Sequence, residues 1–140
     1  MKENFSDEQL KGTETILVVE DQAELLQLVK ISLEDFGYKV MAATGPNEAL
    51  LLSKTYPAVI HLLLTDVIMP AMSGKKLSDE IVKMRPGIKI LFMSGYTANV
   101  LAPHGVFTKG IHFLRKPFTF DELAKRIRYI FNLNSERGDV

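Results

Sequence analysis

Short apolar runs alternate with helical patterns along this chain, and that alternation limits the possible folds more than any other feature. Runs that are apolar throughout, rather than at every second residue, are typical of strands buried on both faces of a parallel sheet. Parallel neighbours need a crossover between them, usually a helix. We therefore expect one α/β domain, a doubly wound five-stranded parallel sheet flanked by helices. The predicted strands cover residues 15–19, 39–43, 60–65, 89–93 and 111–114.

The first predicted helix follows the first strand and ends before Gly37. Asp21 and Glu24 stand three residues apart, as in a capping box, which predicts that Asp21 caps this helix. Leu26 lies about 100° from Leu25 on the helical wheel and is expected on the exposed flank near Gln22. The residues predicted to form the core stripe are Leu25, Leu28, Val29 and Phe36.

Three later helices carry clear start signals, whereas a fourth segment does not. Pro46 suits a first helical position, Ser73 can cap a helix, and Thr119 with Glu122 forms a second capping-box pattern. Residues 97–110 contain Pro and Gly, so any helix there should be short or poorly formed. The stripe predicted for the last helix is Leu123, Ile127 and Ile130.

Composition excludes several classes of site. The chain has 140 residues, no cysteine, and 17 basic against 17 acidic residues. Without cysteine there is no disulfide framework, thiolate zinc site or cysteine nucleophile. The balanced charge predicts no nucleic-acid binding, and no apolar run approaches the roughly 20 residues of a membrane helix. We expect a cytoplasmic domain at 14–131, without membrane contact, between a flexible leader or linker at 1–13 and a polar tail at 132–140.

Polar side chains follow four of the predicted strands: Glu20 and Asp21, then Asp66, Ser94 and Lys116. Because the carboxyl ends of parallel strands meet at the edge where such sheets bind ligands, we expect these side chains to lie together. Their formal charge is −2, from three acids and one lysine. Carboxylates this close repel each other unless a proton or a cation offsets them. A divalent ion with oxygen ligands would neutralise the set, and Mg²⁺ is usual where phosphate is handled.

Each of these side chains also has a structural interpretation, as a helix cap, a turn residue, a partner of the backbone or a solvated lysine. Four positions meeting at one edge are harder to explain in that way. Rival sites have little support, because the chain contains neither GxGxxG nor GxxxxGK[ST]. Acids at 20 and 21 would also repel the phosphate of a flavin nucleotide. The three histidines, His61, His104 and His112, lack ligand-like spacing and are interpreted as structural or solvated.

Four segments carry a family resemblance: Val18–Asp21, Leu64–Pro70, Met93–Tyr96 and Leu114–Phe118. In order and spacing they resemble the motifs of response regulator receiver domains, over about residues 13–131. The sequence around them is most similar to receivers attached to hybrid sensor histidine kinases. The resemblance implies a flavodoxin-like (βα)₅ fold with strand order 2-1-3-4-5 and a place in a two-component phosphorelay.

The resemblance also implies a phosphoacceptor and a metal. Asp66 would take a phosphoryl group from a phosphohistidine of a histidine kinase or a histidine phosphotransfer protein. Mg²⁺ (or Mn²⁺) would be held by Asp21, by Asp66 and by the backbone carbonyl of Ile68, with Glu20 acting through water. These requirements agree with phosphoryl transfer in general, which depends chiefly on alignment and charge neutralisation.

Further roles are implied for residues around the acceptor. Lys116, followed by a cis bond to Pro117, would pair with a phosphoryl oxygen, and Ser94 would hydrogen-bond the phosphoryl group. Ser94 and Phe113 would then switch the protein surface between two states. Many members of the family carry Thr and Tyr at these two positions, and Phe113 cannot form the hydrogen bond that a tyrosine would.

Two other functions remain open at this point. One is a small metal-dependent phosphatase that passes through an aspartyl phosphate, although Ile68 stands where such enzymes usually have an acid. The other is a pseudo-receiver that only binds proteins, although the acid and lysine set is intact. As an enzyme, the chain would at most catalyse its own phosphorylation and slow autodephosphorylation. We expect a monomer or weak dimer, either a stand-alone receiver or part of a hybrid kinase.

Overall fold

The structure, a computed structural model, describes residues 7–107 and 111–137. A single sheet forms its centre, and all neighbouring strands in it run parallel. The strand order is β2-β1-β3-β4-β5, which confirms the predicted sheet and its topology. The strands are β1 (Thr15–Val19), β2 (Lys39–Ala43), β3 (Leu62–Asp66), β4 (Lys89–Ser94) and β5 (His112–Arg115).

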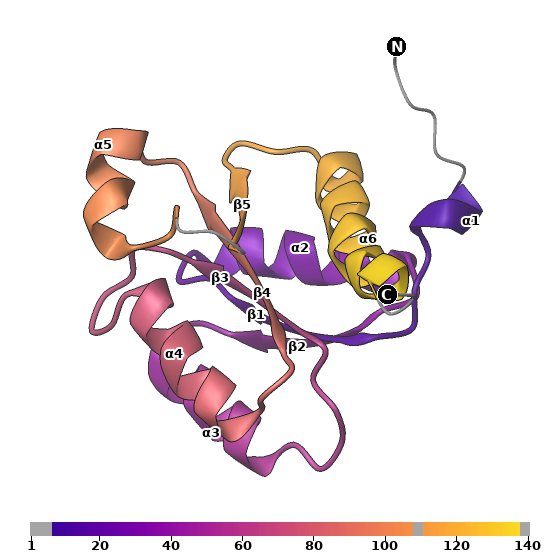
Figure 1. The fold of residues 1–140 in the computed structure, drawn as a ribbon, viewed down its shortest axis with the longest axis horizontal. Coiled ribbons are helices and arrows are strands. Elements are labelled where there is room, and N and C mark those ends of the chain that lie inside the picture. The colour runs from indigo at the N-terminus through magenta and orange to yellow at the C-terminus, as the bar shows by residue number, and fades with distance from the viewer. Residues whose placement is uncertain (1–6, 108–110, 138–140) are drawn as a thin grey trace.

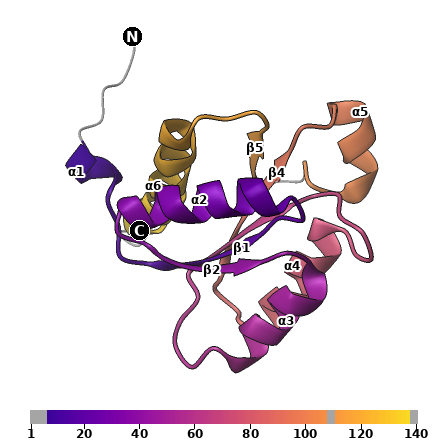
Figure 2. The same ribbon diagram turned by 180° about the vertical axis from the view of Figure 1, so that it is seen from behind.

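Helices cover both faces of the sheet (Figure 1). One face packs against α2 (Ala23–Asp35) and α6 (Phe120–Arg137), and the opposite face packs against α3 (Pro46–Thr55) and α4 (Gly74–Met84). The view from behind shows the same two layers (Figure 2). Alternate residues of each central strand enter opposite cores, as Val18 and Val19 of β1 illustrate. This arrangement explains why the strands are apolar throughout.

The core stripe predicted for α2 is right for Val29, which is buried, and for Leu25 and Phe36, which pack half-buried against the same core, but it is wrong for Leu28. Leu26, expected on the exposed flank, is buried, and Leu28, expected in the core, is 52% exposed. The buried residues are Leu26, Val29 and Leu33, which recur at i, i+3 and i+7. Apolar residues also occupy positions 25, 28 and 31. Because apolar residues surround most of the helix, periodicity alone did not determine which of them face the sheet.

The start of α2 also differs from the prediction. Gln22, not Asp21, is the N-cap residue, and it makes no side-chain capping bond. Glu20 instead holds the start of the helix, because its Oε2 accepts the backbone N–H of Gln22 at 2.9 Å. Asp21 is exposed and free of the capping role. Sequence spacing could not distinguish a cap from an acid that belongs to the strand end.

The capping predictions for α4 and α6 are confirmed. The Ser73 hydroxyl accepts the backbone N–H of Lys76 at 3.2 Å. At α6, Thr119 N–H donates to Glu122 Oε1 at 2.8 Å, and Glu122 N–H donates to Thr119 Oγ1 at 3.0 Å. The three residues predicted to stripe this helix, Leu123, Ile127 and Ile130, are all buried.

The segment after β4 contains only short helices, as predicted. These are α5 (Ala98–Leu101) and the 3₁₀ helix η1 (Ala102–His104). Gly105 follows with φ of 74°, a left-handed conformation that glycine adopts without strain. Residues 108–110, the end of the segment considered in the sequence, lie outside the described residues.

His61 has the structural role expected of it, at the amino-terminal edge of the sheet. Its Nδ1 accepts the backbone N–H of Thr15 at 2.9 Å. The backbone N–H of His61 donates to the Thr15 carbonyl at 2.9 Å, and the backbone carbonyl of His61 accepts the N–H of Lys89 at 3.1 Å. One residue before β3 therefore ties the starts of β1 and β4 together.

The two described ends of the chain meet at this same edge. The short helix α1 (Asp7–Leu10) lies beside α6 in both views (Figures 1 and 2), and its Leu10 is buried. Between α1 and β1, Glu14 accepts from Arg128 of α6 at 2.9 Å. The same guanidinium donates to the Tyr38 hydroxyl at 3.1 Å. The predicted domain limits at 14 and 131 thus fall inside a packed junction, and they stay predictions.

Candidate functional site

A polar pocket of about 170 Å³ lies at the carboxyl-terminal edge of the sheet. Parallel strands deliver its side chains: Asp66 and Ser94 are the last residues of β3 and β4, and Glu20 directly follows β1. Every residue predicted for acceptor, metal or phosphate contact lines this pocket, whereas Phe113 does not. Its full lining is Glu20, Asp21, Gln22, Asp66, Ile68, Ser94, Gly95, Tyr96 and Lys116.

Lys116 joins the two buried acids of the pocket. Its ammonium lies 2.6 Å from Glu20 Oε1 and 2.7 Å from Asp66 Oδ1. Glu20 is fully buried and Asp66 is 5% exposed. The bond from Lys116 to Pro117 is cis, as the resemblance implied. One cation thus serves two carboxyl groups that water scarcely reaches.

This shortage of positive charge sets the protonation of the pair. Burial, together with a hydrogen bond to Glu20, raises the pKa of Asp66 to about 8, against the opposing effect of Lys116. Burial also acts to raise the pKa of Glu20, but hydrogen bonds with Asp66, Lys116 and the Gln22 backbone outweigh it and leave that pKa below its usual value. The raised pKa of Asp66 and the lowered pKa of Glu20 together favour one proton within the pair near neutral pH.

The donor set fits a divalent cation with oxygen ligands. Glu20, Asp21 and Asp66 each offer a carboxylate oxygen, and these atoms all lie within 4.8 Å of one another. Hard cations such as Mg²⁺ prefer such oxygen donors. A bound ion would also replace the proton on Asp66, because ligating carboxyl groups must be ionised. Asp21 is exposed, so the ion's position would remain open to water and to a phosphate oxygen.

Ser94 also lines the pocket, and the backbone fixes the position of its hydroxyl group. It is 4% exposed, and its Oγ accepts the backbone N–H of Tyr96 at 3.0 Å. The hydroxyl hydrogen remains available to donate into the pocket. Tyr96 also lines the pocket and is 52% exposed.

The chain after Asp66 turns sharply beneath the pocket. Gly74, the first residue of α4, donates its N–H to the Val67 carbonyl at 2.6 Å. A Cβ on Gly74 would overlap the backbone carbonyl oxygen of Asp66. Ala71, inside the turn, adopts a left-handed φ of 75°. The helix therefore approaches the acceptor's own backbone at a distance that only glycine permits.

Phe113, predicted as a switch residue, lies on β5 outside the pocket. Its ring meets Phe107 edge-on, with 5.5 Å between the ring centroids. It is half-buried and packs against a small core cluster that includes Leu101 of α5 and Val106. The structure therefore places Phe113 against the segment that contains α5 and η1.

Sequence reasoning missed Gln22 as a pocket residue. The sequence places Gln22 next to the first helix, yet it lines the pocket beside the acids. Its position directly after Glu20 and Asp21 was the available signal. That signal was lost because the capping interpretation assigned the start of the helix to Asp21.

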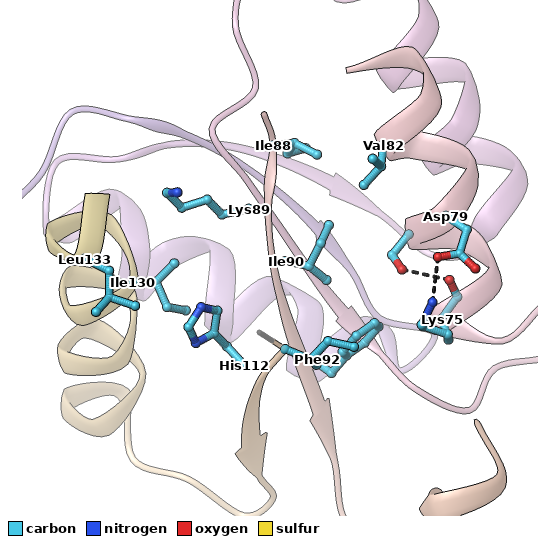
Figure 3. Close-up of a pocket in the computed structure, with 12 residues that line it drawn as sticks. Lys75, Asp79, Val82, Ile88, Lys89, Ile90, Phe92, His112, Ile130 and Leu133 are labelled. Atoms are coloured by element: carbon cyan, nitrogen blue, oxygen red, sulfur yellow. Dashed lines mark hydrogen bonds and ion pairs between the residues drawn. The ribbon is translucent and has the colours of Figure 1, made fainter. Parts of the chain in front are cut away.

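A second hollow, of about 460 Å³, opens between α4 and α6 across β4 and β5 (Figure 3). Its α4 wall carries an ion pair of 2.7 Å between Lys75 and Asp79. Burial and the nearby charges of Arg126 and Lys89 lower the pKa of His112 on its floor. None of the residues predicted for acceptor, metal or phosphate contact lines this hollow.

Comparison with known proteins decides the family. The sequence model of the response regulator receiver domain matches residues 16–128. The chain belongs to this family. Receiver domains are the phosphorelay modules of two-component signalling and work with histidine kinases or phosphotransfer proteins. No described helix of this receiver domain is long and apolar enough to cross a membrane.

Individual relatives of the receiver domain differ in length. This chain is 33% identical over 119 residues to the sensor kinase CckA of Brucella abortus. The matched region covers 85% of this chain but only 13% of the kinase. The chain is 31% identical over 112 residues to the response regulator receiver protein CpdR of the same organism, covering 80% and 92% of the two chains. A CheY-like receiver domain from Methanospirillum hungatei superposes with a TM-score of 0.78 at 25% identity, covering 90% of this chain and 99% of the other.

Proposed function

We propose that this receiver domain accepts a phosphoryl group on Asp66 from a phosphohistidine of a histidine kinase or phosphotransfer protein. The observation that carries the proposal is the position of Asp66 Oδ1, 2.7 Å from the Lys116 ammonium, inside a pocket that also holds Glu20 and Asp21. In the transfer, a carboxylate oxygen of Asp66 bonds to phosphorus as the bond from phosphorus to the histidine nitrogen breaks. The imidazole leaves with the electron pair.

The residues around Asp66 supply alignment and charge. A Mg²⁺ ion held by Asp21, Asp66 and the carbonyl of Ile68, with Glu20 acting through water, would neutralise charge on the transferred group. Lys116 is placed to pair with a phosphoryl oxygen, and it keeps Glu20 as a second partner. Burial acts to lower the pKa of Lys116, but its hydrogen bonds with Asp66 and Glu20 raise it overall, so this side chain stays cationic throughout.

The phosphodonor would dock beside α2, on the apolar surface next to the acid pocket. An apolar hollow of about 440 Å³ adjoins the acid pocket and shares Lys116 with it. Leu25 of α2 lines this hollow, and Leu28 and Ile31 continue outward along the helix, each about half exposed at 52% and 51%. The remaining lining residues are Gly95, Pro117, Phe118 and Phe120. Apolar side chains grouped beside a reactive site favour a protein donor.

Ser94 and Phe113 would transmit the modification. Donation from the Ser94 hydroxyl to a phosphoryl oxygen would draw the end of β4 toward Asp66. Phe113 is on the neighbouring strand and contacts Phe107, so movement at β4 would be felt in the α5–η1 segment. We further place this domain in the cytoplasm, as a monomer or weak dimer that binds no nucleic acid. It would serve either as a stand-alone receiver or as one part of a hybrid kinase.

Intact-mass measurement after incubation with acetyl phosphate or phosphoramidate tests the proposal. We expect the mass of one phosphoryl group, dependent on a divalent cation and absent in Asp66→Asn. Asp79→Asn is the matched control, because Asp79 lies on α4 outside the pocket and should leave labelling intact. Labelling of Asp66→Asn, or full labelling in EDTA, would contradict the mechanism. Rapid turnover without an adduct would favour the phosphatase, and no reaction would favour the pseudo-receiver.

A further inference from the structure

The carboxamide of Gln22 is a polar group at the acid pocket to which the proposed transfer assigns no role. Gln22 lines the pocket and is exposed. It occupies the N-cap position of α2 without making a side-chain capping bond. Among residues 7–107 and 111–137, no partner engages its side chain. Helix capping, the usual structural explanation for a polar residue at this position, is therefore excluded here.

The backbone of Gln22 is fixed although its side chain is free. Its N–H donates to Glu20 Oε2 at 2.9 Å, and its carbonyl accepts the N–H of Leu26 at 3.0 Å. Glu20 is itself buried and paired with Lys116. The backbone of Gln22 is thus anchored to the acid cluster, beside the pocket that this residue lines.

The other walls of the pocket provide no comparable group. Ile68 is apolar and Gly95 has no side chain. The Ser94 oxygen already accepts from the backbone of Tyr96, and Tyr96 itself is 52% exposed. The three carboxyl groups and the lysine are the proposed ligands of the metal and the phosphoryl group. Gln22 supplies the one carboxamide of this pocket, a neutral group that both donates and accepts.

We propose that Gln22 speeds loss of the phosphoryl group from Asp66 by accepting a hydrogen bond from the attacking water. The water oxygen bonds to phosphorus, the bond between phosphorus and the Asp66 oxygen breaks, and the carboxylate leaves with the electron pair. The water's proton passes to the released inorganic phosphate. The amide orients the water and exchanges no proton with it. This inference rests on the proposed phosphorylation of Asp66.

Decay of the acetyl-phosphate-labelled protein, followed by intact mass after the donor is removed, tests the role. Gln22→Met keeps the length of the side chain and removes the amide, and Gln22→Glu keeps an oxygen acceptor. We expect Gln22→Met to hold its phosphoryl group about 2- to 10-fold longer, the rate effect of one hydrogen bond. Gln22→Glu should decay faster than Gln22→Met. Gln27→Met, an exposed position on the same helix, should decay as the wild type does.

A Mg²⁺ titration of the unphosphorylated proteins separates this role from an effect on the metal. We expect Gln22→Met to bind Mg²⁺ with wild-type affinity. Equal decay of Gln22→Met and the wild type would overturn the inference while leaving phosphorylation of Asp66 established. A changed Mg²⁺ affinity would overturn it too, because the amide would then act through the ion. A wild-type protein that takes no label would refute the proposed function and this inference with it.

Discussion

The Asp66 carboxyl group needs a different protonation state for reaction from the one that its buried position favours. The carboxyl is buried beside Glu20, and this burial raises its pKa to about 8, which favours the protonated form at neutral pH when no cation is bound. As a nucleophile, and as a ligand of a cation, it must be ionised. The proton on Asp66 therefore competes directly with the metal, and the competition has a measurable pH dependence.

We predict that Mg²⁺ affinity rises with pH between about 6 and 8 and levels off above the pKa of Asp66, which is near 8. The sign follows because the pKa is raised: below it the folded protein must release a proton before the ion binds. Isothermal titration calorimetry in two buffers of different ionisation enthalpy would measure both the affinity and the protons released. Asp66→Asn should lose this pH dependence. Affinity independent of pH in the wild type would show that Asp66 is already ionised.

We predict that His61→Ala lowers the free energy of unfolding by about 1–3 kcal/mol. Thr15 is 4% exposed, and its backbone N–H would lose the acceptor that His61 Nδ1 provides. Urea denaturation followed by circular dichroism would measure the change. His104→Ala, at the end of η1, is the control and should alter stability by less. An equal effect of both substitutions would show that the bond to Thr15 contributes little.

At the scale of the element, α2 presents two different apolar faces. Leu26, Val29 and Leu33 face the sheet, whereas Leu28 and Ile31 are exposed and Leu25 lines the hollow that adjoins the acid pocket. A helix with apolar residues on both sides needs a partner on its outer face or tolerates an exposed apolar surface. The adjoining hollow makes a docking partner the better explanation.

We predict that Leu28→Arg slows phosphoryl transfer from a histidine phosphotransfer protein about tenfold or more, as expected for an interface anchor. Labelling by acetyl phosphate should be unchanged, because the acid pocket is not altered. Leu51→Arg, 61% exposed on α3, should affect neither reaction. Equal loss with both donors would indicate misfolding, and wild-type rates with both would place docking elsewhere.

At the scale of the whole molecule, the acid pocket and the α5–η1 segment are joined through β4 and β5. The segment has few buried residues, and Val100 and Phe107 are 44% and 50% exposed. Its attachment depends on a small cluster formed with Val67 and Phe92 and on the contact between Phe107 and Phe113. Local opening should therefore cost little here compared with the packed helices.

We predict that backbone amides of residues 98–107 exchange with solvent about tenfold or more faster than those of α4, and that beryllofluoride changes their protection. The analogue would engage Ser94 and shift the populations of the segment through Phe113. Hydrogen exchange measured by mass spectrometry, with and without the analogue, gives the comparison. Strong protection that beryllofluoride leaves unchanged would contradict both the mobility and the switch.

The sequence predicted the sheet and the pocket because buried parallel strands and strand-end residues leave local signals, whereas the strand order followed from the family resemblance. Asp66 and Ser94 could be placed together once the strands were recognised as parallel. The phase of α2 could not be predicted, because apolar residues at 25, 26 and 28 satisfy more than one stripe. Protonation of Asp66 and the position of Gln22 depend on burial and on Glu20, which only the folded chain reveals.

The junction of α1 with α6 has a consequence for how this domain is carried in longer proteins. Both described ends lie at the amino-terminal edge of the sheet, fastened by Glu14 and Arg128. The acid pocket lies at the carboxyl-terminal edge. A neighbouring domain tethered at either end would thus attach at the edge of the sheet opposite the reactive edge. The domain can therefore be joined to different neighbouring domains without the linkage covering the acid pocket.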